Sequence, residues 1–182
     1  MGEPTPPLDR VLDPAPVHAR APVILVSGPG EAPSPAVLAR AESVGRLLAR
    51  SGAVVLTGGR GGVMEAACRG ARAEGGRTLA VLPGRDRHDS PPNESVELCV
   101  FTGMGEARNA ILVLTADAVV AIGGGWGTLS EIALARKTGR PVVLLDSWEM
   151  RPADRSTTGE ETLRARDEAD AVAIALDAAS RR

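Results

Sequence analysis

The sequence is poor in aromatic residues and has no excess of basic over acidic residues, and both facts restrict what the protein can bind. It contains two tryptophans, one phenylalanine and no tyrosine among 182 residues, too few rings for a surface on which successive bases stack. The 21 basic and 23 acidic residues leave a formal charge of −2, so no basic excess favours binding to a phosphate backbone. We therefore expect no nucleic-acid partner.

Cysteine and long apolar runs are also scarce. Cys68 and Cys99 form no CxxC pair and have no neighbouring histidines, so we expect neither a zinc site nor a disulfide framework. No apolar run approaches the roughly 20 residues of a membrane helix, and the first residues lack the pattern of a secretion signal. These observations predict a cytoplasmic protein with reduced thiols, no bound metal and no membrane association.

The chain divides into a short proline-rich beginning and one folded domain. Residues 1–22 carry several prolines without a sustained hydrophobic period, which is typical of an extension. Residues 23–182 are enough for one substantial core, and 43% of the chain is hydrophobic. The sequence therefore predicts an N-terminal extension over 1–22 and a single domain over 23–182.

Short apolar runs alternate with amphipathic segments throughout this domain. We predict strands over 23–27, 53–56, 78–82, 96–101, 118–122 and 141–145, and helices over 36–50, 63–75, 106–114, 128–137 and 161–179. Because each right-handed crossover returns a strand parallel to its predecessor, the alternation predicts a Rossmann-like, doubly wound and mostly parallel α/β sheet with helices on both faces. Such folds bind ligands beyond the carboxyl ends of the strands, where the strand order reverses.

Glycine clusters follow two of the predicted strands and lead into helices. One runs from Gly123 to Gly127 with Trp126 inside it, and the other from Gly58 to Gly62 around Arg60. Glycines let an anion approach the backbone, whose free N–H groups and positive helix end stabilise its charge. One cluster alone could merely turn the chain. Two clusters at equivalent positions predict a concave site that receives donors from both and holds a phosphorylated ligand.

Two common nucleotide motifs are absent. The dinucleotide fingerprint G-x-G-x-x-G does not match the first turn, which reads Gly-Pro-Gly-Glu-Ala-Pro over residues 28–33. The phosphate loop G-x-x-x-x-G-K-[ST] needs a lysine, and the sole lysine, Lys137, lies near the end of a predicted helix. Neither assignment fits this chain.

Two charged residues near the glycines can be explained with or without a ligand. Thr128 to Glu131 matches the S/T-x-x-E capping box, in which the glutamate satisfies the backbone at a helix start. Arg108 could be a solvated helix charge. Of the two tryptophans, Trp126 could line a site or anchor packing, whereas Trp148 is expected to be a surface or interface contact.

Together these motifs resemble those of the Lonely Guy (LOG) family. Residues 124–131 resemble its signature, Pro-Gly-Gly-x-Gly-Thr-x-x-Glu, and residues 56–59, 62–67, 81–84 and 108–109 follow in the family's order. The resemblance runs from about residue 23 to residue 146, which is most of the folded chain, and implies a homodimer or homotetramer. Members are often labelled possible lysine decarboxylases, but pyridoxal chemistry needs a Schiff-base lysine and this chain offers only Lys137. We therefore reject that label here.

The resemblance implies a phosphoribohydrolase, which splits a nucleoside 5′-monophosphate into free base and ribose 5-phosphate. By position, Glu131 is the carboxylate that positions water or stabilises the oxocarbenium-like sugar, and Arg108 orients the ligand and balances charge. An AMP-like ligand is implied, with no required cofactor. The residues that would bind the phosphate or nucleotide are Gly28, Gly58, Gly59, Gly62, Met64, Gly84, Asn109, Gly124, Gly125, Gly127 and Thr128.

Two departures from the family pattern leave a second interpretation open. Gly123 replaces the signature proline, and the family's Arg-Lys pair reads Arg108-Asn109, which removes one positive charge. This variant resembles a sister branch that includes the molybdenum cofactor carrier proteins, which bind a phosphorylated pterin and need not hydrolyse it. The alternative is therefore a non-catalytic carrier of a nucleotide or of the molybdenum cofactor. We favour the enzyme because both catalytic positions are filled.

Overall fold

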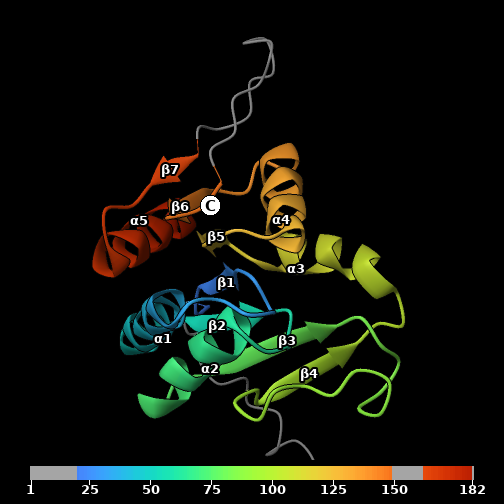
Figure 1. Cartoon of the computed structure of the whole chain (residues 1–182). Coiled ribbons are helices and arrows are strands. Elements are labelled where there is room, and N and C mark those ends of the chain that lie inside the picture. Colours follow the sequence, from blue (N-terminus) through green and yellow to red (C-terminus); the bar gives the residue numbers. More distant parts are fainter. Residues whose placement is uncertain (1–19, 149–161, 182) are drawn as a thin grey trace, which may run out of the picture.

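A computed structural model describes residues 20–148 and 162–181, which form one parallel sheet flanked by helices (Figure 1). The strands are β1 (Val23–Ser27), β2 (Val54–Thr57), β3 (Thr78–Leu82), β4 (Leu98–Phe101), β5 (Ala118–Ile122), β6 (Val142–Leu145) and β7 (Leu163–Arg164). The helices are α1 (Pro35–Arg50), α2 (Val63–Ala73), α3 (Asn109–Thr115), α4 (Trp126–Lys137) and α5 (Glu168–Ser180), and a 3-10 turn, η2 (Gly105–Arg108), precedes α3.

The strand order is β4-β3-β2-β1-β5-β6-β7, and every neighbouring pair is parallel. The chain first winds outward from β1 to β4, then returns to the other side of β1 and winds outward again to β7. The strand order therefore reverses between β1 and β5. This confirms the doubly wound Rossmann-like fold and places the expected ligand position at the carboxyl ends of these two strands.

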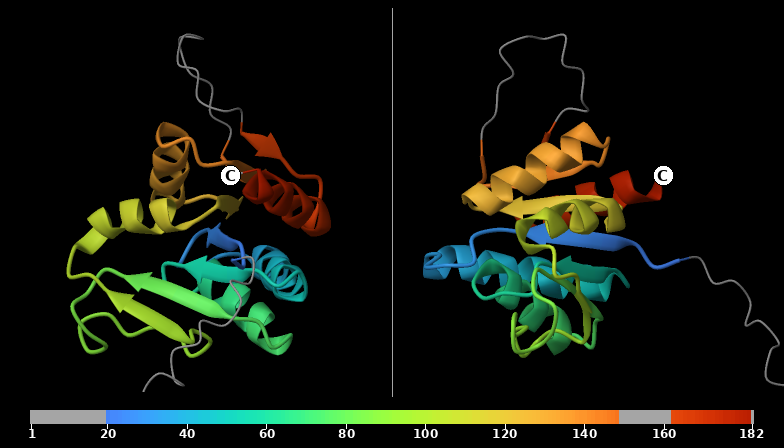
Figure 2. Two further views of the ribbon diagram at one scale, coloured as in Figure 1. Left: turned by 180° about the vertical axis from the view of Figure 1, so that it is seen from behind. Right: turned by 90° about the vertical axis from the view of Figure 1, so that its right-hand side faces the viewer.

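The two helical layers follow from the alternation of side chains along β1. Ile24 and Val26 point into a core shared with α1, α2 and α5, whereas Leu25 points into a core shared with α3 and α4. Both cores are built from aliphatic residues and alanine, because strands covered on both faces must be apolar throughout. The views in Figure 2 show helices on both sides of the sheet.

The sheet is less well covered at the end that carries β4. Leu98 and Val100 of β4 pair in register with Leu79 and Val81 of β3, whose side chains belong to the α3–α4 face. Leu98 and Val100 are nonetheless 46% and 45% exposed. The α3–α4 layer therefore leaves an apolar strip of the edge strand open.

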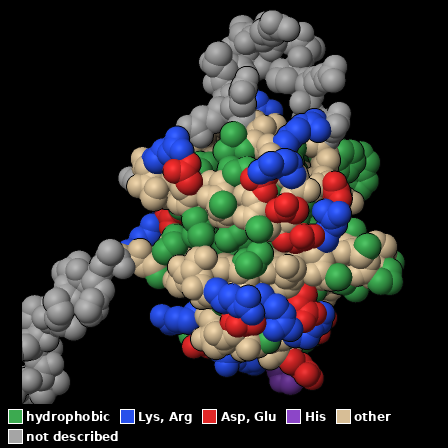
Figure 3. All heavy atoms as spheres, turned by 90° about the vertical axis from the view of Figure 1, so that its left-hand side faces the viewer, with side chains coloured by type: hydrophobic (Ala, Val, Ile, Leu, Met, Phe, Trp, Pro, Cys, Tyr) green, Lys and Arg blue, Asp and Glu red, His purple; other side chains and the backbone are tan. Residues whose placement is uncertain are grey.

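The opposite layer is coated with ion pairs. On α1 and α2, Glu42 accepts hydrogen bonds from both Arg46, at 2.7 Å, and Arg69, at 2.8 Å. Figure 3 shows this side of the molecule, on which acidic and basic side chains are interspersed. Among the described residues, no helix has the length and hydropathy of a membrane span.

The observed element bounds depart from the predicted ones mainly near the C-terminus. The strands predicted at 78–82 and 118–122 are confirmed, and the predicted helix at 106–114 is divided into η2 and α3. The final helix begins at Glu168 rather than at residue 161, because Asp167 caps it by accepting a hydrogen bond from the backbone N–H of Asp170. The short strand β7 was not predicted. Residues 1–19 of the predicted extension, and residue 161, lie outside the described residues.

Candidate functional site

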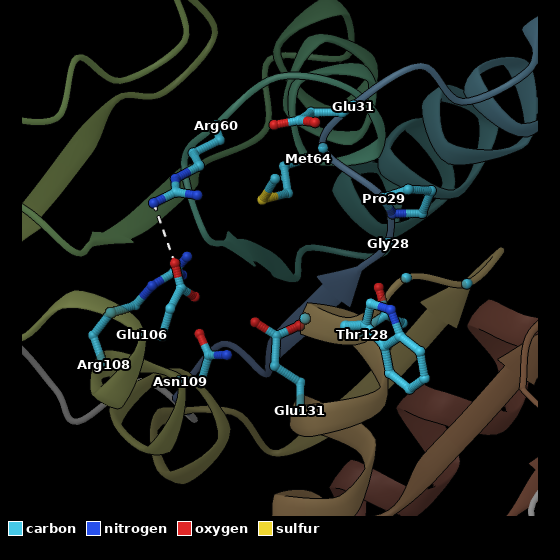
Figure 4. A pocket seen from close by; sticks show the side chains of 15 residues that line it. Gly28, Pro29, Glu31, Arg60, Met64, Glu106, Arg108, Asn109, Thr128 and Glu131 are labelled. Carbon is cyan, nitrogen blue, oxygen red and sulfur yellow. Dashed lines mark hydrogen bonds and ion pairs between the residues drawn. The ribbon is translucent and has the colours of Figure 1, made fainter.

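A pocket of about 570 Å³ opens where the strand order reverses (Figure 4). Its walls come from the loop after β1, the turn after β2 with the start of α2, the segment joining η2 to α3, and the turn after β5 with the start of α4. Nine of the residues predicted for the site line it: Gly28, Met64, Arg108, Asn109, Gly124, Gly125, Gly127, Thr128 and Glu131. The topology thus gathers into one cavity residues that are up to about a hundred positions apart.

The N-terminus of α4 faces this pocket without a side-chain cap. The N-cap residue is Gly125, and the first helical hydrogen bond runs from the N–H of Leu129 to its carbonyl at 2.9 Å. The first amides of a helix have no partner within the helix. The hydroxyl of Thr128 is buried and also lacks a hydrogen-bond partner among the described residues. Amides, hydroxyl and helix dipole together form a site suited to an oxyanion group.

The capping-box interpretation of Glu131 is wrong. The helix begins at Trp126, two residues earlier than predicted, so Glu131 lies in the second turn. From there its carboxylate crosses to β1, where the Ser27 hydroxyl donates a hydrogen bond to Oε2. Glycine at the N-cap gives only a weak sequence signal, which is why the Thr-x-x-Glu pattern suggested the later start.

Glu131 is buried at 8% exposure. Burial is the main influence on its carboxyl group and raises the pKa, while the hydrogen bond from Ser27 and the positive charge of Arg108 act to lower it. The net pKa remains above its ordinary value. An acidic group held this way takes up a proton more readily than an exposed glutamate does, and such groups are common at functional sites.

Arg108 is not a solvated charge, because only 4% of it is exposed. Its Nη1 donates a hydrogen bond to the carbonyl of Val81, at the end of β3, at 3.0 Å. Its Nε is buried and has no hydrogen-bond partner in the part of the chain that the structure describes. Gly58 allows this placement, because a Cβ there would lie 2.5 Å from Nη1. Burial lowers the pKa of Arg108, but a guanidinium keeps its charge in proteins.

Asn109 completes the inner wall beside Arg108. It is the first residue of α3 and is 4% exposed, and its Oδ1 is buried without a hydrogen-bond partner in residues 20–148 and 162–181. Figure 4 shows its amide between Arg108 and Glu131, on the same side of the pocket. The pocket therefore holds a cation, a neutral amide and a carboxylate in a row.

The glycines of the second cluster do not line the pocket, although we predicted that both clusters supply backbone donors to it. Gly59 has a φ of +77° and Gly62 a φ of +66°, values that favour glycine. A Cβ at Gly62 would lie 2.4 Å from the carbonyl oxygen of Pro29. Gly58 and Gly84 are also outside the lining, and a Cβ at Gly84 would lie 2.6 Å from the Cβ of Ser90. These glycines shape the loops, and the pocket takes Arg60 and Met64 from this region instead.

Charged residues at the pocket mouth were missed by the sequence reasoning. Arg60 and Glu106 form an ion pair with 3.3 Å between Nη2 and Oε1, drawn as the dashed line in Figure 4, and Glu31 lies nearby on the lining. Both members of the pair are more than half exposed, so it is weak. Their proximity to glycine turns was the only available signal.

Trp126 and Trp148 lie together at the edge of the site. Their ring centroids are 5.6 Å apart, and the Trp148 Nε1 donates a hydrogen bond to the carbonyl of Gly125 at 3.2 Å. Trp148 therefore supports the turn before α4 and is not simply a surface contact, which corrects the prediction. Trp126 lines the pocket and is 80% exposed. Within the described part of the chain, no group of three or more metal-ligating side chains forms a cluster.

A parallel sheet with a pocket at its switch point and an uncapped helix end inside it defines a Rossmann-like α/β protein of the kind that holds a small ligand. Comparison with known sequences then identifies the family. The chain belongs to the SLOG cluster4 family, whose sequence model matches residues 21–175. This confirms the LOG-like resemblance of the motifs.

Sequence relatives include one uncharacterised protein and two named enzymes. A protein of Archaeoglobus fulgidus is 46% identical over 102 residues, which cover 56% of this chain and 66% of that protein. A cytokinin riboside 5′-monophosphate phosphoribohydrolase of Mycobacterium marinum is 31% identical over 121 residues, covering 63% of this chain and 65% of the enzyme. The matches thus span slightly less than two thirds of these relatives' lengths.

Solved structures resemble the chain over nearly its whole length. The molybdenum cofactor binding protein of Rippkaea orientalis is 38% identical, with a TM-score of 0.77, covering 88% of this chain and 98% of that one. The Moco carrier protein of Chlamydomonas reinhardtii is also 38% identical, with a TM-score of 0.77, covering 90% of this chain and 100% of that one. DNA processing protein A of Helicobacter pylori, at 18% identity and a TM-score of 0.63, shares the fold alone.

Proposed function

We propose that the protein hydrolyses the N-glycosidic bond of a nucleoside 5′-monophosphate, releasing free base and ribose 5-phosphate. The observation that carries this proposal is the burial of Arg108 and Glu131 in one pocket, beside an uncapped helix N-terminus. The phosphoribohydrolases of Mycobacterium marinum and Mycobacterium tuberculosis, 31% and 30% identical, support it. No cofactor is required by the chemistry.

The geometry supports an order of groups along the ligand. The phosphate would bind at the start of α4, on the free amides and the Thr128 hydroxyl. Glu131 lies three residues further along the helix, a rise of about 4.5 Å, so its carboxylate would reach the sugar. The base would then extend toward the mouth, where Arg60 and Glu106 lie.

In this arrangement water attacks C1′ while the bond from C1′ to the base nitrogen breaks. The electron pair of that bond leaves with the base, and one water proton stays on the new C1′ hydroxyl. The other water proton passes to the carboxylate or to solvent, which returns a proton to the departing base. The ionised Glu131 would position the water and stabilise the oxocarbenium-like sugar, and Arg108 would orient the ligand and balance the developing charge. These are the roles expected of the family's arginine and glutamate.

The test is release of free base from a panel of nucleoside monophosphates, followed by chromatography. We expect turnover in the wild type and a loss of about a hundredfold or more in Glu131→Gln, the usual size of an acid–base or charge-stabilising contribution. Glu65→Gln, in the first turn of α2, is the matched control and should keep the wild-type rate. Absence of base from every monophosphate, or full activity in Glu131→Gln, would rule the proposal out.

A second candidate function is a carrier of the molybdenum cofactor or of a nucleotide. Two observations favour it: Moco-binding structures are 38% identical to this chain, and the neutral Asn109 stands beside Arg108 where the LOG motif has lysine. It predicts tight binding without product. Native mass spectrometry of the purified protein would separate the two, because a carrier retains a pterin-sized mass and leaves every monophosphate intact.

The assembly is also proposed from the resemblance, as a homodimer or homotetramer. The exposed strip of Leu98 and Val100 on β4 is compatible with a further protein surface there. Sedimentation velocity would measure the assembly directly. A monomer at micromolar concentration would contradict this expectation without bearing on the chemistry of the pocket.

A further inference from the structure

Asn109 is a buried polar side chain whose oxygen lacks a partner. It is only 4% exposed, and Oδ1 makes no hydrogen bond with any described residue. Native proteins satisfy nearly all buried polar atoms, so each exception calls for an explanation. Here the unpaired acceptor belongs to a residue that lines the pocket. A ligand that supplies a hydrogen-bond donor would remove the deficit.

The neighbours of Asn109 narrow the kind of group that fits. Figure 4 places the amide between Arg108 and Glu131. Ser27 occupies one carboxylate oxygen of Glu131, Oε2, which leaves Oε1 as a second acceptor on this side of the pocket. Neutral O–H groups can donate a hydrogen bond to each of these two acceptors, whereas an oxyanion has no proton to donate to either. The inner wall is therefore suited to a hydroxylated part of the ligand.

The distance from the helix end indicates which part this is. Glu131 lies one turn of α4 beyond Thr128, where the phosphate would bind. In a nucleoside 5′-monophosphate, the group next to the phosphate is the ribose, with its two hydroxyls. The heterocycle, whose N–H groups are the alternative donors, lies further away, toward the mouth.

From these observations we infer that Asn109 is a specificity-determining residue that accepts a hydrogen bond from a ribose hydroxyl. The inference rests on the proposed function, which sets the direction in which the ligand lies in the pocket. A lysine at this position has three donors and no acceptor, so it would bind an anionic oxygen instead. Asparagine makes the site selective for ribosyl phosphates over deoxyribosyl phosphates.

The experiment compares AMP, 2′-deoxy-AMP and 3′-deoxy-AMP by isothermal titration calorimetry with the wild type, Asn109→Leu and Asn109→Asp. After each titration, chromatography shows whether the nucleotide is still intact. Where it has been hydrolysed, the variants are compared by their ratios of kcat/KM instead of their ratios of Kd. We expect at least one deoxynucleotide to bind the wild type about tenfold more weakly than AMP, and this penalty to vanish in Asn109→Leu. Asn109→Asp keeps an acceptor, so it should weaken all three nucleotides and retain the penalty.

Three results would overturn the inference: equal affinities of the wild type for all three nucleotides, a penalty that survives in Asn109→Leu, or no binding of any of them. A deoxy penalty that depends on Asn109, in a protein that releases no base, would support the inference while contradicting the proposed hydrolysis. Thermal melting of each variant ensures that only folded protein is compared.

Discussion

The two glycine turns occupy equivalent places in the fold, yet their surroundings are opposite. In the turn after β5, a Cβ on Gly127 would meet nothing within 4 Å, and one on Gly125 would approach only Pro29, at 3.9 Å. In the turn after β2, a Cβ on Gly59 would lie 2.8 Å from the side chain of Leu82, and one on Gly62 would lie 2.4 Å from the backbone of Pro29. Gly125 and Gly127 thus face open space, whereas Gly59 and Gly62 face protein.

The comparison teaches that glycine at a strand-to-helix turn has two separate uses. In one, the missing side chain leaves room for a ligand to reach the backbone. In the other, it lets the chain adopt a left-handed conformation and pack closely. The residue type is glycine in both cases, so only the atoms that neighbouring elements place around each turn distinguish the two uses.

The largest expected effect is on stability, in the turn after β2. Gly62→Ala combines a φ of +66° with a severe contact to the Pro29 carbonyl, and we expect it to lower the free energy of unfolding by about 3 kcal/mol. Gly75→Ala is the control, because Gly75 has a φ of +70° but no close neighbour; it should cost about 1 kcal/mol. Urea denaturation measures both. Equal losses would show that the backbone relieves the contact.

The next effect is on binding, in the turn after β5. Gly127→Ala places a methyl group in the open space of the pocket, so the affinity for AMP should fall about tenfold, while stability stays the same or rises by up to about 1 kcal/mol. Gly61→Ala in the other turn, where the nearest atom is 3.6 Å from a Cβ, should leave the affinity unchanged. Calorimetry with AMP would test the pair, and unchanged affinity in Gly127→Ala would remove the distinction between the turns.

A smaller effect concerns the carboxylate that follows the open turn. Because the pKa of Glu131 is raised in the folded protein, its ionisation opposes folding above its ordinary value of 4.5. The pKa is raised even with the attraction to Arg108 included, so the ionised carboxylate is a net cost to the folded state. Glu131→Gln removes this cost and should raise the Tm by a few °C at pH 8, since 1 kcal/mol corresponds to about 2–4 °C for a chain of this size.

This gain should shrink as the pH falls toward the ordinary value of 4.5 and disappear below it, where the glutamate is protonated in both the folded and the unfolded state. Scanning calorimetry across this range gives the Tm values. Glu65→Gln, at the start of the helix after the other turn, should show no gain, because a negative charge is favourable near a helix N-terminus. A lower Tm for Glu131→Gln at pH 8 would mean that the carboxylate stabilises the fold.

The smallest effect is expected at Ser27, the last residue of β1, whose hydroxyl links this strand to Glu131 of α4. Its hydrogen bond lowers the pKa of Glu131, so Ser27→Ala should raise that pKa further and change the affinity for AMP by less than about threefold. Carbon-13 NMR titration of the glutamate carboxyls, assigned with Glu131→Gln, follows the shift directly. Ser27→Thr keeps the hydroxyl and should keep the wild-type titration. A downward shift in Ser27→Ala would contradict the geometry.

Much of the fold is predictable from the sequence because buried parallel strands are written as apolar runs bounded by glycine or proline. The strands at 78–82 and 118–122 match the prediction residue for residue. β7 could not be predicted, because it is an edge strand of only two residues. It pairs with β6, and the N–H of Ala165 next to it donates a hydrogen bond to the carbonyl of Leu144. Its formation depends on where β6 lies, not on its own residues.

The site residues that belong to sequence motifs were predictable, whereas contacts that depend on the strand order were not. Arg108, Asn109 and Glu131 follow from the resemblance to the LOG motifs, and all three line the pocket. Ser27 meets Glu131 across 104 positions in the chain, because β1 and β5 are neighbours at the point where the strand order reverses. The spacing of the two residues in the sequence does not predict this hydrogen bond. The strand order has to be known first.

The pairing of Trp126 with Trp148 has a practical consequence. The chain contains no other tryptophan and no tyrosine, so its near-ultraviolet absorption and intrinsic emission originate almost wholly at the rim of one pocket. Light absorbed elsewhere in the molecule is negligible. The protein thus carries an unlabelled optical reporter at the place where a ligand would enter.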